Sequence, residues 1–201
     1  MKLFYADLSP YARKVRVTIA EKGLGGRVEM VSVNPYEIPE ALNAANPLCK
    51  VPTLVTDSGD ALYDSAVICE YLDGEGAEPP LIPAGAARFD MLRRHALANG
   101  VIDAAFNVSS EINRRDEGER SPKWIKHWLA AISRSVHQLD REIGDWPQDL
   151  DLAHITAGCA LSYLDIRLSK QLDWRAGQPA LAAWHEAFAA RPSMVSSQPK
   201  M

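Results

Sequence analysis

The chain has 201 residues, enough for two small domains or one larger one, and its 47% hydrophobic and 24% charged residues are typical of a protein with a packed core. The formal net charge of −4 argues against a nucleic-acid partner, because phosphate binding needs a basic surface. Composition therefore disfavours both an intrinsically disordered chain and a protein that binds acidic polymers.

The sequence contains no pattern typical of targeting or metal binding. Residues 1–5 enter an alternating segment without the apolar run of a signal peptide, and no stretch approaches the roughly 18 apolar residues of a membrane span. The cysteines Cys49, Cys69 and Cys159 form no Cys-x-x-Cys pair, and the five histidines lack ligand spacing. We therefore expect a cytoplasmic protein with no metal and no membrane partner.

Strand-like and helix-like segments alternate in the first third of the chain. Residues 2–5 are β-prone, residues 10–22 have helical periodicity, and residues 28–33 alternate with period two. A strand, a helix and a second strand in this order predict a βαβ unit with parallel strands. The proline-broken stretch that follows leaves room for one short helix.

Two short strands and a helix follow. Residues 53–56 and 61–63 are strand-like, and the sequence between them, Asp-Ser-Gly-Asp, has the composition of a hairpin turn. We expect these strands to pair antiparallel. Residues 65–72 then have the periodicity of a helix.

The composition changes after this helix to Gly, Glu and Pro (DGEGAEPPLIP), which is typical of a stiff, exposed connection. Beyond it, helical periodicity is found in residues 86–113, 122–143, 152–168 and 179–190. We therefore predict an α/β domain over residues 1–75, a linker over 76–84 and an all-helical domain over 85–201.

Ser9 lies directly before Pro10, at the expected start of the first helix. Proline is favoured at the first helical position because its missing N–H would have no partner there, and serine is a common N-cap. Capping alone explains the pair. The same position also places the hydroxyl at the positive end of the helix dipole, where an anion such as a thiolate is stabilised. The two roles are compatible.

Three motifs in a fixed order carry a resemblance to a known family. They are residues 9–15 (SPYARKV), residues 50–54 (KVPTL) and residues 62–72 (LYDSAVICEYL). Together with the predicted order of elements they resemble the cytosolic glutathione transferase superfamily, in particular its bacterial, serine-type members with theta-, zeta- or omega-like N-terminal motifs. The resemblance covers essentially the whole chain. It implies a thioredoxin-like domain that binds glutathione, followed by a helical bundle that carries the second-substrate pocket.

The resemblance also implies roles for Ser9, Val51 and Pro52. Ser9 would donate a hydrogen bond to the glutathione sulfur and thereby act as the catalytic residue. The Val51–Pro52 bond would be cis, leaving the main chain of Val51 to pair with the cysteinyl part of glutathione as an added strand does. The alternative is a proline that only begins an edge strand.

Asp64 and Ser65 would hold the γ-glutamyl end of glutathione, and Lys50 would reach its glycyl carboxylate. Each has a structural alternative. One of Asp64 and Ser65 is expected to cap the helix that follows, which is itself an adequate explanation, and Lys50 could be a solvated loop residue.

In the helical domain, Asp151 stands where the family has a capping box, but His154 replaces the usual acid, which leaves the geometry of the box open. For the second-substrate pocket we expect contributions from Tyr11, Asn99, Ile102 and Phe106.

The function implied is a homodimeric glutathione transferase, which binds reduced glutathione, stabilises its thiolate and conjugates it to a small, hydrophobic electrophile. Glutathione is the only co-substrate expected. Two alternatives stay open: a non-catalytic or regulatory binding module with the same fold, and a glutathione-dependent isomerase, dehalogenase or peroxidase.

Overall fold

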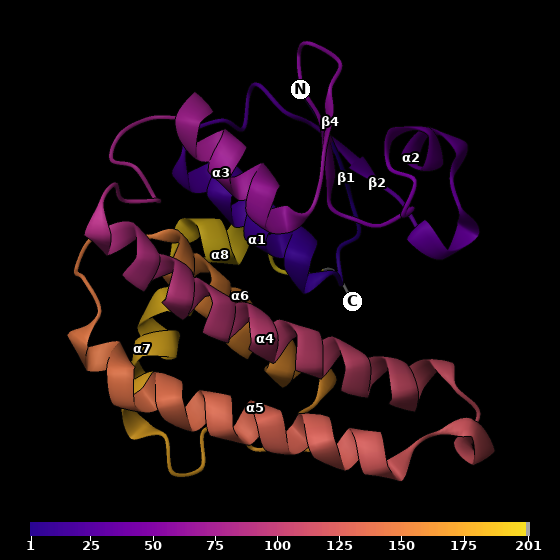
Figure 1. Ribbon diagram of the computed structural model, residues 1–201, viewed down its shortest axis with the longest axis vertical. Helices are drawn as coiled ribbons and strands as arrows, with labels where there is room; N and C mark the ends of the chain where they lie inside the picture. Colours follow the sequence, from indigo (N-terminus) through magenta and orange to yellow (C-terminus); the bar gives the residue numbers. More distant parts are fainter. Residues whose placement is uncertain (200–201) are drawn as a thin grey trace. The chain divides into compact units, whose positions relative to one another are not determined.

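The computed structural model describes residues 1–199 and divides into two compact units (Figure 1). The first unit consists of Met1–Pro83 together with the segment that begins at Pro192, and the second is Ala84–Arg191. The sequence-based division differs here, because it assigned the C-terminal segment to the helical domain. The physical reason lies in Arg13, a buried side chain that donates a hydrogen bond of 3.0 Å to the carbonyl oxygen of Met194.

The first unit is a small mixed sheet with helices. Its elements are β1 (Lys2–Tyr5), α1 (Pro10–Glu21), β2 (Glu29–Ser32), the 3₁₀ turn Pro35–Glu37, α2 (Glu40–Ala45), β3 (Thr53–Val55), β4 (Ala61–Leu62), α3 (Ser65–Glu75) and α8 (Pro192–Ser196). The strand order is β2-β1-β3-β4. Strand β1 pairs parallel with β2 and antiparallel with β3, and β3 pairs antiparallel with β4. The predicted βαβ unit and hairpin are confirmed.

Apolar side chains of α1 and α3 form the core of this unit against the sheet. Leu3 and Leu54 are register partners on β1 and β3, and both are fully buried, as are Val15 on α1 and Ile68 and Leu72 on α3. The two helices lie side by side (Figure 1). Because burial of large aliphatic side chains is the main stabilising contribution, this core fixes the starts of both helices against the sheet.

A buried ion pair joins the end of α1 to the last turn of α3. The Lys22 ammonium lies 2.9 Å from the Asp73 carboxylate and also donates to the carbonyl oxygen of Pro79 at 3.1 Å. The Asp73 carboxylate in turn accepts from the backbone N–H groups of Leu81 and Ile82, at 2.7 and 3.0 Å. These bonds satisfy both buried charges, as burial requires.

The second unit is entirely helical where it has regular structure, as predicted. Its elements are α4 (Ala86–Arg114), the 3₁₀ turn Glu117–Glu119, α5 (Pro122–Glu142), the 3₁₀ turn Ile143–Asp145, α6 (Leu152–Arg167) and α7 (Pro179–Ala189). Helix α4 packs on both α5 and α6. Every residue from Leu152 to Leu164 is buried, so α6 is the central helix of the bundle.

The start of α6 is a complete capping box despite the histidine. The Asp151 carboxylate accepts from the backbone N–H of His154 at 3.0 Å, and the His154 Nδ1 accepts from the backbone N–H of Asp151 at 3.2 Å. Burial acts to raise the pKa of the Asp151 carboxyl, but the hydrogen bond from the His154 backbone N–H and the Arg94 guanidinium 3.1 Å away act against it, and that pKa lies below its ordinary value.

Within residues 1–199, none of the helices combines the length and the apolar character that crossing a membrane requires. The same residues contain no group of three His, Cys, Asp or Glu side chains placed to hold a metal ion.

Candidate active site

The topology of the sheet brings the three motifs of the first unit to one edge. Strand β3 runs antiparallel to β1, so the start of β3 lies beside the end of β1, from which the chain leads to Ser9. Strand β4 runs antiparallel to β3, so its end also lies at this edge and leads to Asp64 and Ser65. The residues just before β3 are Val51 and Pro52. The motifs are therefore neighbours in the fold although more than 50 positions separate the first from the last.

Ser9 is the N-cap of α1, as predicted. Its Oγ accepts from the backbone N–H of Ala12 at 3.2 Å, and Pro10 occupies the first helical position. The first turn of α1 contains no acidic residue, and Arg13 and Lys14 are buried directly behind it. The helix dipole and these two cations all make the potential around Ser9 favourable to an anion.

The Val51–Pro52 peptide bond is cis, which confirms that prediction. Neither the N–H nor the C=O of Val51 has a hydrogen-bond partner within the described part of the chain. The loop before it is well held, because the Lys50 carbonyl oxygen accepts from the Thr53 hydroxyl at 2.8 Å and from the buried Asn46 amide at 3.3 Å. The main chain of Val51 is thus a fixed donor and acceptor available to a peptide-like ligand.

Asp64 is the residue that caps α3, which decides between the two candidates that the sequence left open. Its carboxylate accepts from the backbone N–H of Ala66 at 3.0 Å. Ser65 is 3% exposed, and neither its hydroxyl nor its backbone N–H has a partner among residues 1–199. The hydroxyl oxygen is open to solvent, and two unpaired donors at a helix N-terminus are suited to a carboxylate ligand. The peptide bond before Asp64 is also cis.

The remaining predicted residues lie in both units. Lys50 is exposed and has no ion-pair partner in the described residues. Tyr11 is half-buried on the first turn of α1. Asn99 and Phe106 are half-buried on α4, and Ile102 between them is completely buried, as a core residue would be. Their membership of a second-substrate pocket stays a prediction.

Cys69, on α3, is a core residue. Its thiol is buried and accepts from the Thr18 hydroxyl at 3.3 Å. Burial raises the pKa of the thiol, which keeps it neutral and unreactive.

Sequence reasoning missed the supporting residues Asn46 and Arg13. Asn46 is buried behind the Val51 loop and also binds the Thr53 hydroxyl at 2.9 Å, and Arg13 is held by the C-terminal segment. The signal for Asn46 was its position before Pro47, where asparagine commonly begins a turn. No local pattern pointed to the partners of Arg13, which lie more than 180 positions away.

Two family models match this chain. The model of the glutathione S-transferase N-terminal domain matches residues 8–75, which include all three motifs, and that of the C-terminal domain matches residues 122–187. The chain belongs to the glutathione S-transferase family. The small mixed sheet and the all-helical unit are accordingly the thioredoxin-like and the helical parts of the fold of the cytosolic glutathione transferase superfamily.

Relatives in the family align along the whole chain. A glutathione transferase family member from Pseudomonas fluorescens, whose crystal structure contains bound glutathione, is 39% identical with a TM-score of 0.94, and the match covers 100% of this chain and 99% of that one. The uncharacterized GST-like protein YibF of Escherichia coli is 30% identical over 99% of this chain and 98% of its own. Maleylacetoacetate isomerase of Pseudomonas aeruginosa is 27% identical over 93% and 96% of the two chains.

Proposed function

We propose that the protein is a cytoplasmic glutathione transferase, which binds reduced glutathione on its first unit and transfers the glutathione sulfur to a small, hydrophobic electrophile. The observation that carries the proposal is Ser65, at the tip of α3, whose hydroxyl and backbone N–H have no partner among the described residues and whose hydroxyl oxygen is open to solvent. The glutathione bound in the Pseudomonas fluorescens relative supports it.

Glutathione would be held by main-chain and helix-tip contacts. The Val51 N–H and C=O would pair with the cysteinyl backbone, as an added strand pairs with a sheet edge. Ser65 would bind the γ-glutamyl carboxylate through its hydroxyl and N–H, with the Asp64 carboxylate near the γ-glutamyl ammonium. Lys50 would meet the glycyl carboxylate as a point charge.

Ser9 would then stabilise the sulfur as a thiolate. A free thiol has a pKa near 8.5, so only a small fraction is ionised at neutral pH. A hydroxyl donor at the positive end of α1, with Arg13 and Lys14 behind it, lowers that pKa and raises the concentration of the nucleophile. No covalent bond to the protein forms: the thiolate attacks the electrophilic carbon, and the displaced electron pair leaves with a halide, or stays on the product as the alkoxide of an opened epoxide or as an enolate, which then takes a proton from water.

The test of binding is calorimetry with reduced glutathione on the wild-type protein and on Ser65→Ala. The variant should raise the Kd about ten-fold or more, since it removes a hydrogen bond to a charged group. Its free energy of unfolding should not fall, because the hydroxyl has no partner in the free protein. Ser193→Ala, which removes the hydroxyl of another buried serine of the same unit, is the matched control and should leave the Kd unchanged. Wild-type protein that gives no heat with millimolar glutathione contradicts the proposal.

Turnover is tested separately with an aryl halide, an epoxide, an α,β-unsaturated carbonyl compound and a peroxide. Conjugation of any of the first three supports the transferase. Binding of glutathione without turnover of any of them supports the binding module instead.

A second candidate is the glutathione-dependent isomerase, favoured by the full-length similarity to maleylacetoacetate isomerase. An isomerase consumes no glutathione, because the thiolate that adds to a double bond is expelled after rotation about the resulting single bond. Measurement of free thiol during turnover of a cis-unsaturated dicarboxylic compound therefore separates the two reactions: a transferase depletes the thiol and an isomerase does not.

The assembly proposed is a homodimer. Exposed apolar side chains on the third and fourth helices, Val67 on α3 and Phe89 on α4, support it, since Phe89 is 75% exposed. Sedimentation of the wild type as a dimer and of Phe89→Asp as a monomer is the expected result, and a monomeric wild type contradicts it.

A further inference from the structure

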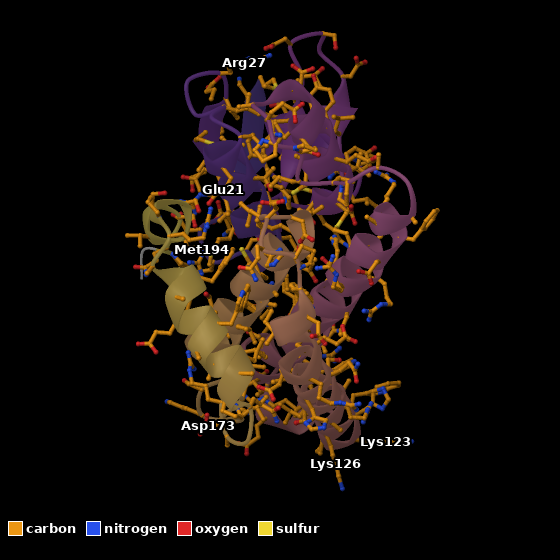
Figure 2. All side chains as sticks on the ribbon, turned by 90° about the vertical axis from the view of Figure 1, so that its left-hand side faces the viewer. Glu21, Arg27, Lys123, Lys126, Asp173 and Met194 are labelled. Atoms are coloured by element: carbon orange, nitrogen blue, oxygen red, sulfur yellow. The ribbon has the colours of Figure 1, made fainter. Side chains whose placement is uncertain are left out.

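The segment that spans the first half of α5 and its flanks, residues 120–139, has a charge distribution unlike that of the chain as a whole. The sequence contains 26 acidic and 22 basic residues, yet residues 120–139 include Arg120, Lys123, Lys126 and Arg134 and no acid. Lys123, Lys126 and Arg134 are exposed, and none of them forms an ion pair within the described residues. Figure 2 shows Lys123 and Lys126 projecting from the helical unit. A local positive potential therefore lies on an otherwise acidic protein.

Aromatic side chains are exposed on the same half of the helix. Trp124 is 51% exposed and stacks on Trp128, with ring centroids 5.6 Å apart, while the His127 ring meets Trp124 edge-on at 5.3 Å. The first fully buried residue of α5 is Ile132, so the preceding turns, nearly three in number, contribute little to the core of the bundle. Large exposed aromatic side chains of this kind mark interaction surfaces.

A groove lies beside this half of the helix. It has a volume of about 670 Å³ and lies between the Glu117–Glu119 turn and α5. Its lining includes the apolar side chains of Ile125 and Leu129, the cations Arg120 and Lys126, and one acid, Glu117.

We propose that this face, defined by Arg120, Lys123, Trp124, Lys126 and Arg134, binds an acidic segment of another protein. An apolar side chain of that segment enters the groove over Ile125 and Leu129, and its carboxylates meet Lys123, Lys126 and Arg134. The positive charge of the face suits the carboxylates of such a segment, and the apolar lining of the groove suits its apolar side chain. An acidic, amphipathic peptide has both.

Other polyanions fit less of the surface. A nucleic acid would meet three or four cations on a protein of net charge −4 and would leave the apolar groove empty. A bilayer with anionic lipids would take up Trp124 and the lysines, but a flat surface does not fill a groove. Both are therefore outcomes that the experiment must distinguish from a peptide.

The first experiment is selection from a random peptide library on the full-length protein, with the Lys126→Glu variant used to remove peptides that bind elsewhere. The expected result is enrichment of sequences that carry an excess of Asp and Glu around one large apolar residue. Enrichment of neutral or basic peptides, or no enrichment, would overturn the proposal.

The second experiment measures an enriched peptide against a matched pair of variants. Lys126→Glu on the face should raise the Kd about ten-fold, whereas Lys170→Glu, an equal change of charge at an exposed residue of the same unit, should leave it within about two-fold. Trp124→Ser should also weaken binding while leaving the Kd for glutathione unchanged. Equal effects of the two lysine variants would overturn the proposal.

The third experiment sets the peptide beside other partners. A DNA duplex and vesicles of phosphatidylserine and phosphatidylcholine should bind at least ten-fold more weakly than the peptide at physiological salt. If the duplex or the vesicles bind more tightly than the peptide, that partner and not an acidic peptide is the ligand of this face. Self-association that Trp124→Ser abolishes would show instead that a second copy of the chain occupies this face.

Discussion

Helices α1 and α5 begin with the same two residues and the same capping interaction, but their settings differ. Ser9 precedes Pro10 and Ser121 precedes Pro122, and each serine Oγ accepts from the backbone N–H three residues later, at 3.2 and 3.4 Å. Behind the first cap, Arg13 and Lys14 are buried. Behind the second, the corresponding residues are Ile125, which is half-buried, and Lys126, which is exposed.

The comparison shows that a serine–proline pair specifies where a helix starts and nothing more. Ser9 gains a candidate catalytic role from its place at the sheet edge, beside the unpaired main chain of Val51 and the free donors of Ser65. Ser121 has no such neighbours, and its own N–H is taken by the Glu111 carboxylate at 2.9 Å. Whether a capping serine can act in catalysis therefore depends on the groups that the fold places beside it.

The largest expected loss of stability comes from breaking an ion pair at the C-terminal end of one of these two helices. Asp73→Ala leaves the Lys22 ammonium buried without its carboxylate, so we expect the free energy of unfolding to fall by about 3–5 kcal/mol. At the end of α5, Glu142→Ala breaks an ion pair with Arg93, which is about half exposed. This change should lower the free energy of unfolding by no more than about 1 kcal/mol. Urea unfolding of both variants, followed by circular dichroism, is the measurement. Equal losses would show that the Lys22 pair is effectively solvated.

Much of this fold could be predicted from local pattern, because each element carries its own periodicity and start signal. The βαβ order, the hairpin and four long helices are examples. Helix α8 was missed because Pro192–Ser196 is only five residues long and shows no periodicity. The Lys22–Asp73 pair could not be predicted, since lysine and aspartate are normally exposed and their partners lie far along the chain.

The cap of α6, Asp151, differs from the two serine caps because it carries a charge. Asp151→Asn can still accept from the His154 N–H but no longer neutralises the buried Arg94, so we expect a loss of about 2–3 kcal/mol at neutral pH. The folded-state pKa of Asp151 lies below its unfolded value near 3.8, so the stabilisation is complete above that pH and is lost as the pH falls through the folded-state pKa.

Urea unfolding at a series of pH values tests this prediction. The difference between wild type and Asp151→Asn should shrink below about pH 3.8, whereas the exposed Asp149→Asn should show almost no difference at any pH. A difference that is independent of pH would mean that the charge of Asp151 does not contribute.

Substitutions at two glycines near the end of α3 test how closely the chain there packs against the C-terminal end of α1. A Cβ at Gly76 would lie 2.5 Å from the Cβ of Lys22, so Gly76→Ala should destabilise the first unit by about 1–3 kcal/mol. Gly74 lies inside α3, where a Cβ would meet no atom within 4 Å, and Gly74→Ala should stabilise by about 0.5–1 kcal/mol. Thermal unfolding of both proteins is sufficient, and shifts of the same sign would contradict the close packing.

The site could be predicted less fully than the fold, and for a physical reason. The sequence left open which of Asp64 and Ser65 caps α3, because either side chain can accept the bond. Only the structure shows that Asp64 does so, which leaves Ser65 buried with free donors. The positions of Ser9, Val51 and Ser65 along one edge likewise follow from strand register, which no single motif encodes.

The smallest expected effect on stability is also the one that separates the two serine caps. Ser9→Ala and Ser121→Ala each remove one capping bond, so each should lower the free energy of unfolding by about 1 kcal/mol. Only Ser9→Ala should raise the pKa of the bound glutathione thiol, because only that hydroxyl is proposed to lie at the sulfur. The pH dependence of thiolate absorbance in the glutathione complex measures this shift, with Ser121→Ala as the control for lost capping. If both variants have the wild-type pH profile, the Ser9 hydroxyl acts only as the cap of α1. The helix dipole and the cations Arg13 and Lys14 would then be the groups that lower the pKa of the thiol.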